Sequence, residues 1–187
     1  MAAPDAAWRA SGNDPGVSDP QADRHAVELA EHLLFQEVAC LDEQRWDDWL
    51  ELFCADCEYW VPSWKDEHEP TEDPRRELSL IYYRNRAGLE DRVWRVRSHR
   101  SVASSPLPRT HHVVTNVRAS REAGSRCLRG RSNWTVHQFR LKSRDVELMF
   151  GRYEHEWIED GESWKIRRRK ALLLNDLMPA MLDFYSL

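Results

Sequence analysis

Residues 146–159 read VELMFGRYEHEWIE, in which apolar and polar side chains alternate as they do along a β-strand. The apolar positions are Val146, Leu148 and Phe150 before Gly151, and Tyr153 and Trp157 after it. A change of phase within one strand requires an extra residue on that strand. We therefore predict a β-bulge at Gly151, within a long strand that curves.

The neighbouring segments show the same alternation, at residues 110–118, 127–141 and 163–174. In the second of these, Trp134, Val136 and Gln138 share one face and Thr135, His137 and Phe139 share the other. Gly161-Glu162 predicts a tight turn between the last two strands. The second half of the chain is therefore expected to form long antiparallel strands.

The first half favours helices. Apolar residues recur every three or four positions at residues 24–41, 46–53 and 85–97, with Asp23 and Asn85 as expected N-caps. Between them we expect a short strand at residues 58–62 and a long polar loop at 63–77, with a short helix at 177–185 ending the chain. Helices followed by antiparallel strands indicate an α+β fold, in which a strongly curved sheet wraps around the N-terminal helix as a cone.

The length of 187 residues suits one domain. Residues 1–22 are rich in Ala, Pro, Gly, Asp and Ser, which is typical of a flexible tail, so we expect a single domain at 23–187. The net charge of -5 argues against a nucleic-acid partner. No apolar run is long enough to span a membrane and no secretory signal is visible, which favours a cytoplasmic protein.

Several runs resemble the small (β) subunits of aromatic-ring-hydroxylating dioxygenases of the benzoate and anthranilate type. The similar stretches are TEDP at 71–74, SLIYYRNRAGLEDRV at 79–93, Asn133-Trp134, and Lys170 with the 174–176 LND run. Leu41-Asp42 followed by WDDWL at 46–50 also fits the family. The resemblance spans roughly residues 24–185 and is a pattern along the chain rather than one short motif.

The resemblance implies an NTF2-like fold and a structural role. It implies an α3β3 complex, in which this chain forms a trimer beneath large subunits that carry a Rieske [2Fe-2S] cluster and a mononuclear iron. Such a complex adds both atoms of dioxygen to an aromatic carboxylate, with electrons from a reductase. This chain would then hold no cofactor and no active site of its own.

The cysteines and histidines do not follow a Rieske pattern, which needs C-x-H and C-x-x-H spacing. Cys54 and Cys127 have no histidine two residues on, and Trp60 stands three residues after Cys57. The single C-x-x-C at 54–57 lacks the second ligand pair of a zinc site, and we expect its thiols to pack as small apolar groups. We therefore expect no metal site in this chain.

The alternative is a stand-alone NTF2-like isomerase or dehydratase that binds a small molecule inside the cone. Such an enzyme uses inward-facing acid–base groups. The candidates for these groups are Asp56, Tyr83, His112, His137 and His155.

A scaffolding subunit needs surfaces that adhere to its neighbours. The aromatic residues around the long loop exceed what a small core requires, and buried aromatic and arginine side chains are typical interface anchors. We therefore expect a subunit interface that uses Trp60, Trp64, Tyr82, Tyr83, Arg92 and Trp94, with the aromatic ones exposed on loops. Residues 167–170, RRRK, lie on a predicted strand, where alternate side chains face opposite ways and form no single basic patch.

Overall fold

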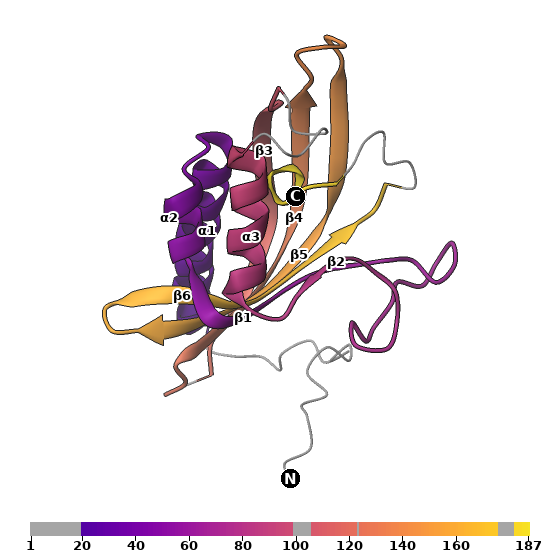
Figure 1. The fold of residues 1–187 in the computed structure, drawn as a ribbon. Coiled ribbons are helices and arrows are strands. Elements are labelled where there is room, and N and C mark those ends of the chain that lie inside the picture. Colours follow the sequence, from indigo (N-terminus) through magenta and orange to yellow (C-terminus); the bar gives the residue numbers. More distant parts are fainter. Residues whose placement is uncertain (1–19, 99–105, 123, 176–181) are drawn as a thin grey trace.

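A computed structural model describes residues 20–98, 106–122, 124–175 and 182–187 of the chain (Figure 1). Its elements are α1 (Pro20–Asp42), α2 (Trp46–Glu51), β1 (Phe53–Pro62), β2 (Ser79–Tyr83), α3 (Arg86–Arg97), β3 (Arg109–Ser120), β4 (Cys127–Phe139), β5 (Val146–Asp160), β6 (Ser163–Leu173) and the short 3-10 helix η2 (Phe184–Ser186). Residues 1–19 of the tail expected at 1–22, and residues 177–181 of the expected last helix, lie outside the described residues, whereas residues 20–22 belong to α1.

The described strands form one sheet in the order β2-β1-β6-β5-β4-β3. All neighbours are antiparallel except β1 and β6, which run parallel. Strands of 11 to 15 residues cannot stay flat, because the twist of each strand accumulates along the sheet. Figure 1 shows the strands curving behind α1, α2 and α3, which lie side by side on one face. The predicted α+β layout with a curved sheet is confirmed.

Aromatic side chains fill the space between the helices and the sheet. Trp49 of α2 stacks on Phe184, with ring centroids 4.8 Å apart, and meets Phe53 of β1 edge-on at 4.9 Å. Trp134 of β4 stacks on Tyr153 of β5 at 5.2 Å. Buried aromatic pairs of this kind add stabilisation beyond the area they bury. The described end of the chain is therefore part of the core.

The capping residue of α3 and the turn residue of the hairpin between β5 and β6 were predicted correctly from the sequence. The Asn85 side chain accepts a hydrogen bond from the Gly88 amide at 3.3 Å, and the predicted apolar face of α3 is buried. Gly161 has φ +63°, a conformation that glycine adopts without strain, and it turns β5 into β6. Both elements confirm the predictions from sequence.

Two boundaries differ from expectation. Helix α1 begins at Pro20, before Asp23, because proline is tolerated in the first turn, where its missing N–H would have no helical partner. Strand β1 begins at Phe53 rather than at residue 58, so Cys54 and Cys57 lie on the strand and not before it. Both thiols are unpaired, and burial raises the pKa of Cys57 to about 12. This is consistent with thiols that pack as apolar groups.

The predicted bulge at Gly151 is wrong. Strand β5 keeps an unbroken register with β4 across Gly151, and its alternate positions from Met149 to Trp157 all face the core. Val146, Leu148 and Phe150 lie on the opposite, outer face, where they are 41–64% exposed. Gly151 is needed for a different reason: a Cβ there would lie 1.9 Å from the Leu172 carbonyl oxygen of β6. The close approach of two curved strands, and not a bulge, excludes a side chain.

A buried ion network joins the helical layer to the sheet. Arg169 of β6 donates from Nε to Glu37 Oε1 of α1 at 2.7 Å, and from Nη2 to the Leu187 main-chain oxygen at 2.9 Å. The other carboxylate oxygen of Glu37 lies 3.0 Å from Nε2 of His155 on β5. The guanidinium also lies over the rings of Tyr59 and Tyr153, at 4.9 and 4.6 Å. Its partners thus come from α1, β1, β5 and the chain's last residue.

The charge states of the network follow from this geometry. Burial acts to raise the pKa of Glu37, but Arg169 and His155 outweigh it and lower the pKa to about 2. Burial lowers the pKa of His155, although Glu37 opposes this. Near neutral pH the network is therefore an ionised Glu37–Arg169 pair, and the neutral His155 ring donates a hydrogen bond to the carboxylate.

We predict that Glu37→Gln lowers the free energy of unfolding by about 3–5 kcal/mol, because it leaves the Arg169 charge buried without a counterion. Chemical denaturation measures the change. Glu43→Gln, which breaks an exposed pair with Arg45, is the matched control and should cost at most about 1 kcal/mol. Equal losses from the two variants would show that the buried pair is not what holds α1 to the sheet.

The same pair predicts an acid dependence. The pKa of Glu37 falls from its ordinary 4.5 to about 2 on folding. The stabilisation that ionised Glu37 gives the fold is therefore complete at pH values above its ordinary pKa. It is lost as the pH drops toward the pKa of Glu37 in the folded protein. Between these limits, the unfolding free energy of the wild type should depend more steeply on pH than that of Glu37→Gln. Parallel curves for the two proteins would contradict the assignment.

We also predict that Gly151→Ala lowers the melting temperature, because the added methyl group must push β5 away from β6. Overpacking of this kind costs about 1–3 kcal/mol. Arg152→Ala, at the next and exposed position of the same strand, should leave the melting temperature nearly unchanged. If both variants melt like the wild type, the strands are not in close contact at this point.

Candidate functional site

The inward-facing histidines are each held by a carboxylate. His112 of β3 lies with Nδ1 2.6 Å from Asp42 Oδ1, and its backbone N–H donates to Asp42 Oδ2 at 2.9 Å. Burial acts to raise the pKa of Asp42, but the hydrogen bonds with His112 lower it. His155 is paired with Glu37 in the buried network. Both rings thereby fasten α1 to a strand.

The remaining pocket candidates do not converge with them. His137 is exposed on the outer face of β4, whereas His155 of β5 is buried on the inner face of the sheet. Its ring is 6.2 Å from that of His111, which faces outward on β3. Asp56 is exposed on β1, and Tyr83 is half-buried on β2. The sequence-predicted acid–base set is therefore distributed over both faces of the sheet.

The predicted aromatic interface is in part a folding contact. The expectation that Trp60 is an exposed loop residue is wrong: it is fully buried on β1, and its Nε1 donates to Ser79 Oγ at 2.9 Å. Trp64 donates to the Leu173 carbonyl at 2.9 Å, and the Tyr82 hydroxyl donates to Glu58 at 2.7 Å. Trp94 of α3 is 52% exposed. Of this aromatic set, Trp94 presents the largest exposed surface.

Arg92 also has a partner within the chain. Its Nε and Nη2 donate to the two carboxylate oxygens of Asp183, at 2.9 and 3.1 Å. The Asp183 side chain is 1% exposed and caps η2 through the Phe184 amide. Such a two-pronged pair holds both groups in a fixed geometry. Arg92 therefore anchors the described end of the chain to α3.

The outer face of β3, β4 and β5 carries an exposed apolar surface that sequence reasoning missed. We call it the outer patch and define it by Val113, Val146, Leu148 and Phe150, which are 36–64% exposed. Val113 and Phe150 lie in one cross-strand row through Thr135, and Leu148 follows in the next row beside His137. The sequence contained a signal for the outer patch, because Val146, Leu148 and Phe150 occupy alternate positions of one strand and therefore share a face.

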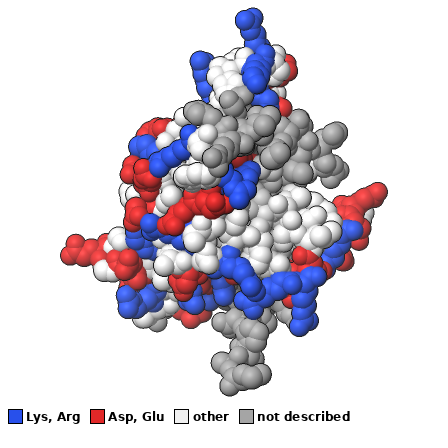
Figure 2. All heavy atoms as spheres, viewed as in Figure 1, with Lys and Arg blue, Asp and Glu red and all other residues white. Residues whose placement is uncertain are grey.

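An exposed apolar surface with polar residues around it marks an interaction site. Around the outer patch lie His111, His137, Asn133 and Arg152, all exposed on the same strands. Figure 2 shows charged side chains of both signs crowding the lower rim of its view, with an uncharged area near the centre. The outer patch is therefore suited to contact another protein chain.

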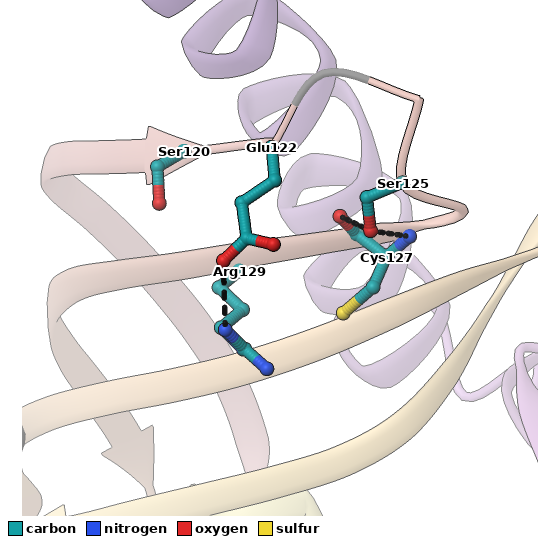
Figure 3. A pocket seen from close by; sticks show the side chains of 5 residues that line it. All are labelled: Ser120, Glu122, Ser125, Cys127 and Arg129. Carbon is teal, nitrogen blue, oxygen red and sulfur yellow. Dashed lines mark hydrogen bonds and ion pairs between the residues drawn. The ribbon is translucent and has the colours of Figure 1, made fainter. Parts of the chain in front are cut away.

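Figure 3 shows a small cleft of about 50 Å³ near the end of β3 and the start of β4, lined by Ser120, Glu122, Ser125, Cys127 and Arg129. The Cys127 amide donates to Ser125 Oγ at 3.1 Å, and Arg129 lies 3.9 Å from Glu122. Burial raises the pKa of the Cys127 thiol, so the thiol and not the nucleophilic thiolate is the favoured form.

A larger open cleft of about 180 Å³ lies over β1, β2 and β6. Its lining is dominated by arginine and consists of Asp56, Glu58, Arg75, Tyr82, Arg84, Arg167 and Arg168. We call it the arginine cleft.

The part of the chain that the structure describes holds no group of three or more His, Cys, Asp or Glu side chains that could bind a metal ion. None of its helices is long and apolar enough to cross a membrane.

The sequence of this chain is similar to those of known proteins. The profile of the family described as "Ring hydroxylating beta subunit" matches residues 36–180. The β subunit of benzoate 1,2-dioxygenase from Acinetobacter baylyi is 36% identical over 165 residues, which are 88% of this chain and 96% of that protein.

Solved structures agree as well. The β subunit of benzoate 1,2-dioxygenase from Burkholderia mallei is 35% identical, with a TM-score of 0.70 over 84% of this chain and 95% of that one. A hexachlorocyclohexane dehydrochlorinase from Novosphingobium barchaimii, at 18% identity and a TM-score of 0.54, covers 83% of this chain and 91% of its own, and shares the fold alone. The expected NTF2-like fold is thereby confirmed. This chain belongs to the ring-hydroxylating β-subunit family and is the small subunit of an aromatic-ring-hydroxylating dioxygenase.

Proposed function

We propose that this chain is the structural subunit of a benzoate-type dioxygenase, which supports an iron-bearing large subunit that dihydroxylates an aromatic carboxylate. The observation that carries the structural role is the outer patch, where four apolar side chains are exposed together on one face of the sheet. The substrate class follows from the benzoate 1,2-dioxygenase β subunits that match nearly the whole chain.

The chemistry of this reaction belongs to the partner subunit in our proposal. Dioxygen activation in this family needs a Rieske cluster and a mononuclear iron, and the residues that the structure describes gather no set of ligands for either centre. Cys54, Cys57 and Cys127 all have raised pKa values because of burial, which opposes the thiolate that iron requires. A reductase would deliver its electrons to the large subunit, and this chain would carry no cofactor and no active site.

The assembly we propose is α3β3, in which the outer patch of one copy meets a second copy and closes a ring of three. Obligate interfaces are more apolar than ordinary surface, and a closed ring leaves no apolar patch exposed. We further propose that Trp94, on the helical side of the sheet, faces the large subunit together with Trp64, Tyr82 and Tyr83. Residues 23–187 would act as one domain in the cytoplasm.

A stand-alone isomerase or dehydratase is disfavoured. His112 and His155 are the two buried histidines among its candidate acid–base groups, and each ring is held against a carboxylate of α1. The match to dioxygenase subunits at 36% identity also supports the main proposal, whereas the dehydrochlorinase shares only the fold at 18%.

We predict that Phe150→Asp breaks the trimer, because it places a charge within the apolar outer patch. Sedimentation of the wild-type chain should give about 66 kDa, three copies of the 22.1 kDa chain. Phe150→Asp should sediment as a monomer, with an unchanged circular dichroism spectrum.

Trp94→Asp is the matched control, since it introduces the same charge at an exposed aromatic residue on the other side of the sheet. It should remain a trimer. A trimeric Phe150→Asp, or a monomeric Trp94→Asp, would contradict the assignment of the outer patch to self-association.

A further inference from the structure

The arginine cleft is built by an irregularity in β6. Glu156 of β5 pairs with Arg168, and the next residue, Trp157, pairs with Ile166, so Arg167 is an extra residue on its strand. Such a bulge redirects a side chain. Arg167 and Arg168 therefore both line the outer cleft, whereas Ile166 and Arg169 point into the core. The expectation from sequence that residues 167–170 alternate strictly between faces is corrected here.

The cleft has more positive charge than its own carboxylates can balance. Four guanidinium groups face two carboxylates, Asp56 and Glu58. Glu58 is already engaged, since it accepts from the Tyr82 hydroxyl at 2.7 Å and lies 3.7 Å from Arg168. Arg167 is paired only loosely, at 3.9 Å from Glu156. The balance leaves a local excess of about two positive charges, on a chain whose net charge is -5.

Arg75 and Arg84 carry this excess. Among the described residues, neither side chain has a carboxylate within ion-pair distance, and both are exposed. Both line the cleft together with Tyr82, whose hydroxyl donates to Glu58. Arg75 comes from the long loop before β2 and Arg84 directly follows β2, so the loop and the strand both contribute to the cleft. Guanidinium groups arranged in this way are suited to grip a carboxylate from two sides.

The size of the cleft favours a protein side chain over a free small molecule. At about 180 Å³ and open to solvent, it is smaller than the roughly 300–1,000 Å³ typical of pockets that enclose small ligands. One or two Asp or Glu side chains of a docked segment would fit it. An apolar surface does not complement a cationic cleft, so the outer patch of a second copy is not its partner.

We propose that the arginine cleft is a docking site for an acidic segment of the large subunit, which Arg75 and Arg84 bind through its carboxylates. This inference rests on the proposed function, because it needs a large subunit as partner. The cleft lies over β1, β2 and β6, at the opposite edge of the sheet from β3. One chain can therefore hold a neighbouring copy and a large subunit at the same time.

The test measures binding of the full-length chain to the purified, iron-loaded large subunit at low and at high salt. The double variant Arg75→Glu/Arg84→Glu should bind about tenfold or more weakly at low salt, since it replaces attraction by repulsion. Because salt screens repulsion as well as attraction, binding of the variant should not weaken as the salt concentration rises, whereas binding of the wild type should. Sedimentation of the variant alone should still give the trimer.

Arg76→Glu is the matched control, because Arg76 is the next residue of the same loop, is 86% exposed and does not line the cleft. It should bind like the wild type. Equal binding by the double variant and the wild type overturns the inference and leaves the proposed function standing. Loss of the trimer in the double variant assigns the cleft to a second copy and overturns it too. A wild-type chain that does not bind the large subunit contradicts the proposed function and the inference together.

Discussion

The buried guanidinium of Arg169 is the point on which the structure depends. A charge in the core is tolerated only where it is paired and hydrogen-bonded, and here the partners are Glu37, the Leu187 oxygen and two tyrosine rings. Because these groups come from α1, β1, β5 and the last residue, the network can form only when helices, sheet and chain end are all in place. It thereby fixes the one arrangement that fills the cone.

A filled cone determines where function can lie. In a curved-sheet fold, the inner face can enclose a ligand or be packed, and in this chain Glu37, His155, Arg169 and the aromatic core occupy it. The features left for function are on the surface: the outer patch on one half of the sheet and the arginine cleft on the other. This division agrees with a subunit that holds its neighbours in position and leaves the oxidation chemistry to them.

Local patterns in the sequence predicted the elements well, because caps, turns and alternation act over a few residues. Asn85 and Gly161 are examples. Two features could not be predicted in this way. Glu37 and Arg169 are 132 residues apart, so no local spacing reveals their pairing. The apolar residues before Gly151 were expected to face the core, as those after it do. Alternation alone cannot tell which face of a strand is buried. An apolar outer face was therefore mistaken for a change of phase at a bulge.

We propose that this chain is a cofactor-free scaffold within an α3β3 dioxygenase. Native mass spectrometry of the complex co-purified with its large subunit, followed by iron analysis of the separated subunits, tests it most directly. We expect three copies of each subunit, with all the iron in the large one. Iron retained by this chain, or a chain that is recovered without a large subunit, would contradict it.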